Sequence, residues 1–167
     1  MSTGAHWFRN WGRALLLISP GLAAGDQLPF GPDSLGQIER EYAGEPFLLV
    51  LWSADCFPCR KELATLGAIT RTNPDLNLVL LATDDIVDKA MLGAILEQHG
   101  LAHMASWIFA HPNVERLRYS VDPQWYGELP RSYFYDADAG RRGISGPLAA
   151  EAVEAWLSSQ RSADQSL

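Results

Sequence analysis

The chain has 167 residues, 47% of them hydrophobic and 20% charged, and its formal net charge is −7. This length and composition predict one globular domain with a real hydrophobic core. Because the chain is acidic and its basic residues cluster no further than pairs such as Arg60 with Lys61, we expect no nucleic-acid partner.

The first 25 residues differ in kind from the rest of the chain. Arg9 and Arg13 come first, an apolar run covers 14–18, and small residues occupy 23–25. This is the order of a secretory signal peptide, and the run is shorter than the roughly 18 apolar residues that span a bilayer. We therefore predict a signal peptide over 1–25, a folded domain over 26–161 and a polar tail over 162–167. The protein is expected in the periplasm, with a membrane anchor as the alternative.

The first half of the domain alternates between helical and strand patterns. Residues 26–36 are rich in Pro and Gly and have room for one short strand. The pattern then predicts a helix over 35–42 capped by Ser34, a strand over 47–53, a helix over 57–70, a strand over 76–83, and a helix that begins at Asp84 or Asp85 and ends at Gly100. Both strands are continuous apolar runs, which fits strands covered on both faces. In the second helix we expect Leu63, Leu66 and Ile69 to face inward and Lys61 and Glu62 to face outward.

The second half ends in a hairpin and a helix. A short strand over 106–110 and a helix over 112–119 are predicted before a loop. The hairpin covers 131–145, and the amphipathic helix covers 147–160. Strands that alternate with helices imply parallel pairing, and the hairpin adds antiparallel strands. The predicted fold class is therefore α/β, with a central mixed sheet flanked by helices on both faces.

Both cysteines of the chain, Cys56 and Cys59, lie between the strand over 47–53 and the helix that follows it. In an exported protein, two thiols this close either form a structural bridge or perform redox chemistry. A bridge that closes so short a loop constrains the unfolded chain very little, which favours chemistry. At the start of a helix, unpaired backbone N–H groups stabilise the Cys56 thiolate. Cys59 is one turn further along, so it is expected to be buried and to remain a thiol.

The motif Trp52-x-x-x-Cys56-Phe57-Pro58-Cys59-Arg60-Lys61-Glu62 is followed, about seventy residues later, by Leu129-Pro130 just ahead of the hairpin. Together these features resemble thioredoxin-fold proteins, and in particular the exported TlpA/ResA/DsbE group of thiol–disulfide oxidoreductases, over residues 34–160. The resemblance implies that Cys56 and Cys59 are catalytic and that no cofactor is needed. It also implies that Pro130 is cis, lies beside the disulfide, and lets the backbone of Leu129 meet a substrate peptide.

Three neighbouring residues are expected to support the cysteines. Trp52 is predicted to form the core wall beside the disulfide, and Pro58 suits the first turn of a helix, where its missing N–H is not needed. Asp55 places a negative charge next to Cys56, which disfavours the thiolate. We therefore expect a Cys56 pKa that is nearer to the value of about 7 in thioredoxin than to the value of about 3.5 in DsbA, and a reducing couple.

The resemblance also raises two questions about acidic residues. Thioredoxin has a buried acid two residues before the tryptophan, where this chain has Val50, so the proton acceptor for the second cysteine must come from elsewhere or from water. The TlpA/ResA group often carries an acid near the active site on an inserted segment, and Asp84, Asp85 and Glu128 are the candidates here. Among the loop aromatics, Trp125 and Tyr126 either line a substrate groove or cap the core.

The predicted function is an exported oxidoreductase that reduces disulfides in periplasmic proteins, for which the resemblance suggests apocytochrome c or copper-site proteins. A membrane electron donor of the DsbD/CcdA type would re-reduce it, and a monomer is expected. Two alternatives use the same cysteines. One is a DsbA-like oxidant. The other is a metallochaperone, because two soft thiolates suffice to hold Cu(I).

Overall fold

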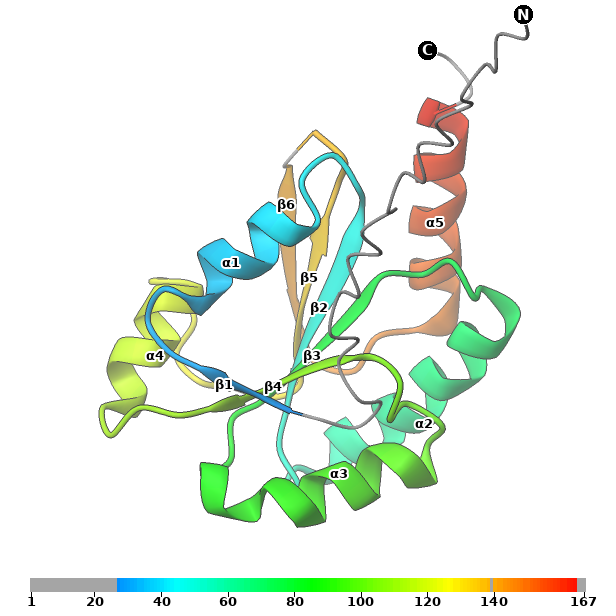
Figure 1. Ribbon diagram of the computed structural model, residues 1–167. Helices are drawn as coiled ribbons and strands as arrows, with labels where there is room; N and C mark the ends of the chain where they lie inside the picture. The colour runs from blue at the N-terminus through cyan, green and yellow to red at the C-terminus, as the bar shows by residue number, and fades with distance from the viewer. Residues whose placement is uncertain (1–26, 139, 165–167) are drawn as a thin grey trace, which may run out of the picture.

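The computed structural model describes residues 27–138 and 140–164 (Figure 1). The predicted signal peptide lies outside this part of the chain. In order, the elements are β1 (Leu28–Phe30), α1 (Ser34–Glu41), β2 (Phe47–Trp52), α2 (Phe57–Thr72), β3 (Leu78–Ala82), the 3₁₀ turn η1 (Ile86–Asp88), α3 (Lys89–Gln98), β4 (Ala105–Phe109), α4 (Val114–Val121), β5 (Arg131–Tyr135), β6 (Arg141–Ser145) and α5 (Ala150–Asp164).

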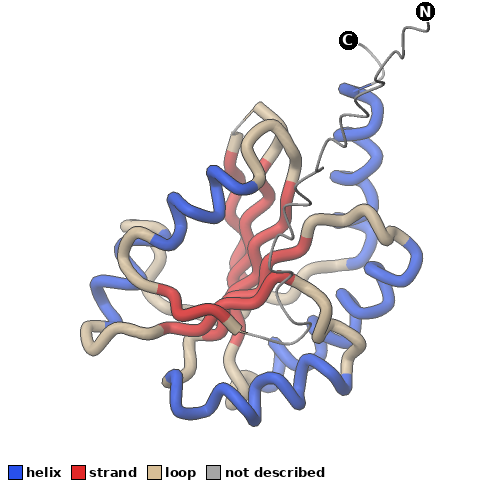
Figure 2. Tube along the Cα trace, in the orientation of Figure 1, coloured by secondary structure: helices blue, strands red, loops and turns tan. Residues whose placement is uncertain are grey.

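The six strands form one mixed sheet in the order β1-β4-β3-β2-β5-β6. Strands β1, β4, β3 and β2 are parallel to their neighbours, while β5 is antiparallel to β2 and pairs with β6 in the late hairpin. The sequence prediction of a central mixed sheet is therefore confirmed. Figure 2 shows the helices on either side of the strands.

Successive side chains of β2 enter two separate cores, as the two-residue period of a strand requires. Val50 and Trp52 belong to the cluster covered by α2, α3 and α5, whereas Leu49 and Leu51 belong to the cluster covered by α1 and α4. All six residues of β2 are buried. This explains why its sequence is a continuous apolar run rather than an alternation of apolar and polar residues.

Two predicted helix starts differ from the structure. Asp85 caps the turn η1 rather than a helix, because its carboxylate accepts a hydrogen bond from the N–H of Val87 at 3.2 Å. Ser34 is the first residue of α1 instead of its cap, and its hydroxyl accepts from the N–H of Gly31 at 2.9 Å. At the other end of the chain, α5 (Ala150–Asp164) begins and ends later than the helix predicted over 147–160.

One edge of the sheet gathers the segments that carry the predicted site. The parallel strands β2 and β3 both end there, so the loops that follow them are neighbours. Because β5 is antiparallel to β2, with Arg131 opposite Leu51, the loop that leads into β5 reaches the same edge. Within the described residues, no helix has the length and apolar character needed to cross a membrane.

Candidate active site

Cys56 and Cys59 form a disulfide at the N-terminus of α2. Cys56 is the N-cap residue, and its Sγ accepts a hydrogen bond from the N–H of Cys59 at 3.2 Å. A turn closed by the Cys56 N–H and the Ser53 carbonyl at 3.2 Å joins the end of β2 to this cap. Pro58 lies in the first turn of the helix, where an N–H is not needed.

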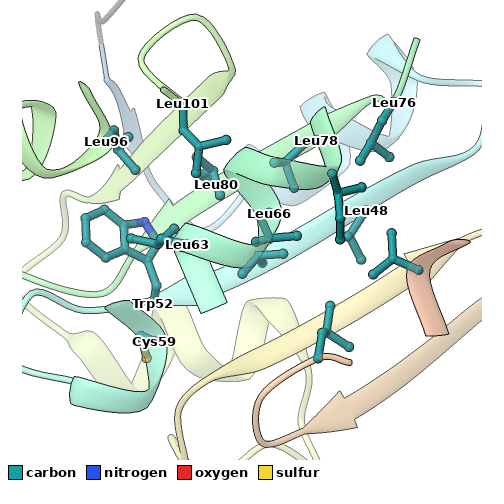
Figure 3. Packing of buried hydrophobic residues seen from close by; sticks show 14 of the residues in the cluster. Leu48, Trp52, Cys59, Leu63, Leu66, Leu76, Leu78, Leu80, Leu96 and Leu101 are labelled. Atoms are coloured by element: carbon teal, nitrogen blue, oxygen red, sulfur yellow. The ribbon is translucent and has the colours of Figure 1, made fainter. Parts of the chain in front are cut away.

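The two sulfurs differ in access, as the sequence predicts. Cys56 is half-buried, while Cys59 is fully buried in the core cluster beneath α2. Figure 3 shows Cys59 at one end of that cluster, with Trp52, Leu63 and Leu66. Trp52 is itself completely buried, so it contributes to the wall behind the disulfide. An incoming sulfur can therefore reach Cys56 far more easily than Cys59.

Asp84 fixes the loop that leads to Cys56. Its carboxylate accepts from the Ser53 hydroxyl at 3.0 Å and from the N–H of Ala54 at 3.1 Å. Burial raises the pKa of Asp84, although these hydrogen bonds oppose the effect, and the charge of Asp55 raises it further. Of the three acids proposed as site neighbours, Asp84 is thus the one that contacts the cysteine loop.

The loop before β5 reaches the same edge of the sheet as the cysteine loop. The Leu129–Pro130 bond is cis, as the resemblance implies. Pro130 is buried, and its carbonyl accepts from the N–H of Gly146 at 2.9 Å. Leu129 and Cys56 are both partly buried against the same core cluster. The register of β2 and β5 places Leu129-Pro130 at the same edge of the sheet as the loop that carries the cysteines.

Glu128 stabilises this loop through its side chain. Its carboxylate accepts from the Ser145 hydroxyl at 2.7 Å and lies 3.7 Å from the guanidinium of Arg131. Burial raises the pKa of Glu128, but the Ser145 hydrogen bond and the Arg131 charge outweigh it and the pKa is lowered. Glu128 is therefore an ionised anchor between the loop and the late hairpin.

Glu62 is a candidate site residue that the sequence analysis placed wrongly. We expected it to face solvent, but its side chain is only 2% exposed. One carboxylate oxygen accepts from the N–H of Leu148 at 2.9 Å, and the other has no hydrogen-bond partner. Burial raises its pKa to about 7, against the opposing effects of the Leu148 N–H and of the Ser132 hydroxyl, which is buried and has no other partner of its own.

The position of Glu62 relative to Cys59 was a signal in the sequence. Residues three apart on a helix lie on the same face, so Cys59, Glu62 and Leu66 form one buried row on α2. Val50, which replaces the buried acid of thioredoxin, belongs to the same core cluster as Cys59. A buried acid is therefore present on this side of the sheet, but α2 supplies it instead of β2.

A metal site formed by several ligands finds no support here. Within residues 27–138 and 140–164, no three or more His, Cys, Asp or Glu side chains gather as metal ligands would. The two cysteines of the disulfide are the only thiols of the chain. Reduction of this bond would give two thiols, and a thiolate formed from them can attack a disulfide or bind a metal ion.

No protein-family model and no curated protein matches this sequence. Solved structures do match. A secreted disulfide oxidoreductase of Mycobacterium tuberculosis, homologous to E. coli DsbE, has a TM-score of 0.58 and 18% identity over 72% of this chain and 85% of its own. A DsbF homologue from Corynebacterium diphtheriae has a TM-score of 0.57 and 15% identity over 72% of this chain and 75% of its own.

StoA from Bacillus subtilis is similar as well, with a TM-score of 0.51 and 18% identity over 69% of this chain and 84% of its own. A further match is described as a thiol:disulfide interchange protein of the thioredoxin family, from Chlorobium tepidum. The sheet order, the disulfide at the start of α2 and these likenesses agree. The chain has the thioredoxin fold.

Proposed function

We propose that the protein is an exported thiol–disulfide oxidoreductase that reduces disulfides in other proteins. The observation that carries the proposal is the Cys56–Cys59 disulfide at a helix N-terminus, with one accessible and one buried sulfur. The cis Leu129–Pro130 bond at the same edge of the sheet supports it. The similar structures named as disulfide oxidoreductases or thiol:disulfide interchange proteins support it.

The reaction is a two-step exchange that starts from the reduced protein. The Cys56 thiolate attacks a substrate disulfide, a mixed disulfide forms, and one substrate sulfur leaves as a thiolate. Cys59 then attacks the Cys56 sulfur and releases the second substrate thiolate. The substrate gains two electrons, and the protein is left with the Cys56–Cys59 bond.

Glu62 supplies the proton acceptor for the second step. Cys59 is buried and must lose its proton before it can attack, yet water reaches it poorly. Glu62 lies one turn further along the same buried face, has one carboxylate oxygen without a partner, and has a pKa of about 7. A general base works best when its pKa lies near the working pH.

The acids near Cys56 favour a reductant over an oxidant. Asp55 is adjacent in sequence, and Asp84 bonds the backbone two residues before Cys56. Negative charges oppose thiolate formation, and a less stabilised thiolate belongs to a more reducing couple. A membrane donor of the DsbD/CcdA type would then be needed to restore the dithiol. Apocytochrome c or copper-site proteins are the proposed substrates.

Export rests on the sequence and on similarity. The predicted signal peptide lies outside the described residues, and one of the similar structures is of a secreted protein. To test export, the full chain is expressed and the N-terminus of the mature protein is sequenced. Cleavage after residue 23 or 25 is expected, and an uncleaved, membrane-bound chain would favour the anchor.

The reduction potential of the Cys56–Cys59 pair tests the function. Equilibration with glutathione or dithiothreitol should give a potential well below about −200 mV, in the range of reductants. A potential close to that of DsbA, about −120 mV, would favour the oxidant instead. If the pair has no reversible couple, both the reductant and the DsbA-like oxidant are excluded, and metal binding by the reduced thiols remains. A copper titration of the parent and of Cys59→Ser would then test metal binding.

A further inference from the structure

The two aromatic residues ahead of Leu129-Pro130 have opposite environments. Trp125 is only 4% exposed and belongs to the core cluster beneath α1 and α4. Tyr126 is 88% exposed, more than any other large hydrophobic side chain among those described as exposed. Trp125 therefore contributes to the hydrophobic core, whereas the ring of Tyr126 makes no contribution to the core.

The backbone around Tyr126 is held in place on both sides. The indole N–H of Trp125 donates to the Glu128 carbonyl at 2.8 Å, which bridges across Tyr126. From α4, the Arg118 guanidinium donates to the Tyr126 carbonyl at 3.2 Å. Gly127 has a φ of 96°, a left-handed conformation that other residues rarely adopt. The exposed ring therefore projects from a fixed loop.

This loop leads to the same edge of the sheet as the loop that carries the reactive disulfide, because Arg131 at the start of β5 pairs with Leu51 near the end of β2. Tyr126 precedes Leu129 by three residues, and Leu129 packs against the same core cluster as Cys56. Phe57, which lies between the two cysteines in sequence, is also exposed, at 69%. Two uncovered aromatic rings thus belong to the two segments that reach this edge of the sheet.

We propose that Tyr126 is a specificity-determining residue that contacts an apolar side chain next to the cysteine of a polypeptide substrate. The proposal rests on the proposed function, because it assigns a substrate class to the same site. An aromatic ring on a fixed loop loses little conformational entropy when it makes a contact. Aromatic contacts of this kind contribute enough free energy to change binding about three- to tenfold.

The test compares three substrates of one enzyme. Two are peptides with the same internal disulfide, one with leucine and phenylalanine beside the cysteines and one with serine at those positions. The third is a small aromatic disulfide without a peptide chain. KM, kcat and the reduction potential are measured for the parent, Tyr126→Ala and Tyr126→Phe. Tyr119→Ala is the matched control, because Tyr119 is a second exposed tyrosine, at 68%, and lies on α4.

Tyr126→Ala should raise KM for the apolar peptide about three- to tenfold, while kcat and the reduction potential stay as in the parent. It should leave the serine peptide and the small disulfide unaffected, and Tyr126→Phe should behave as the parent. Equal losses on both peptides, or equal effects of Tyr126→Ala and Tyr119→Ala, would overturn the proposal while leaving the oxidoreductase function intact. A parent that exchanges electrons with none of the three substrates would instead remove the proposed function and this inference with it.

Discussion

Replacing Glu62 by glutamine should slow the second half of the exchange reaction and leave the first half unchanged. Glutamine has the same shape, and its carbonyl oxygen can still accept from the N–H of Leu148, so the packing under α2 is preserved. It cannot accept a proton from Cys59. A positioned general base contributes about 10² to 10⁴ in rate, so we expect resolution of the mixed disulfide to slow by about a hundredfold at neutral pH.

The same substitution should make the protein more stable above neutral pH. The pKa of Glu62 rises from its usual value of 4.5 to about 7 in the fold, mainly because the carboxylate is buried. Because the folded state favours the neutral carboxyl, the contribution of Glu62 to the free energy of unfolding is complete below about pH 4.5, and it is lost as the pH rises through about 7. At about 1.4 kcal/mol per pH unit, the difference amounts to about 3 kcal/mol. Glu62→Gln stays neutral and should retain that free energy at pH 8.

The assay separates the two half-reactions. When the reduced protein is mixed with an aromatic disulfide in a stopped-flow instrument, attack by Cys56 releases one coloured thiol in a concentration-dependent phase. Attack by Cys59 releases a second one in a concentration-independent phase. In the parent, the rate of that second phase should rise with pH and level off above about 7, as Glu62 ionises. Glu97→Gln on α3 is the control, because Glu97 is an exposed acid far along the chain from the cysteines.

Two results would refute this reasoning. If Glu62→Gln leaves the second phase and its pH profile as in the parent, Glu62 is not the proton acceptor. If the free energy of unfolding of the oxidised parent does not fall between about pH 4.5 and 8 relative to Glu62→Gln, the carboxyl does not titrate near neutrality in the fold.

The remaining predictions concern the loop charge and the core. Asp84→Asn keeps the acceptor for Ser53 and Ala54 but removes the negative charge, so it should lower the Cys56 pKa by up to about one pH unit. The control is Asp88→Asn, on the neighbouring turn η1, which should leave the Cys56 pKa unchanged. The rate of cysteine alkylation as a function of pH gives the Cys56 pKa of both variants. Leu66→Ala should lower the free energy of unfolding by about 2 to 5 kcal/mol, because its side chain is 1% exposed. Denaturant titration of the oxidised protein checks this, and a loss below about 1 kcal/mol would contradict the packing described for the core.

The strand and helix order was readable from the sequence because each element carries its own pattern. The continuous apolar run over 47–52 and the apolar residues three apart on α2 are local patterns, which can be seen without knowledge of the rest of the fold. The position of the two cysteines could also be predicted from the sequence. The predicted strand ends just before the predicted start of the helix, which places Cys56 at the helix N-terminus.

The acids of the site were harder to assign, because burial of a charge depends on distant residues. Glu62 follows two basic residues and belongs to a helix that has an exposed face, so local pattern placed it outside. Its carboxylate is covered by Leu148, 86 residues further along the chain. For Asp84, pairing of β2 with β3 decided that it bonds the cysteine loop instead of capping a helix.

By itself, the sequence indicated the α/β fold class through its strand and helix patterns and the redox pair through its spacing, and the resemblance to thioredoxin-fold proteins implied the cis bond at Leu129-Pro130. Only the tertiary structure decided which acid is buried beside Cys59, and that Trp125 packs inward while Tyr126 remains exposed. Adjacent residues in a loop have no fixed period, so their directions depend on contacts with other elements. Arg118 from α4 and the Glu128 carbonyl supply those contacts here.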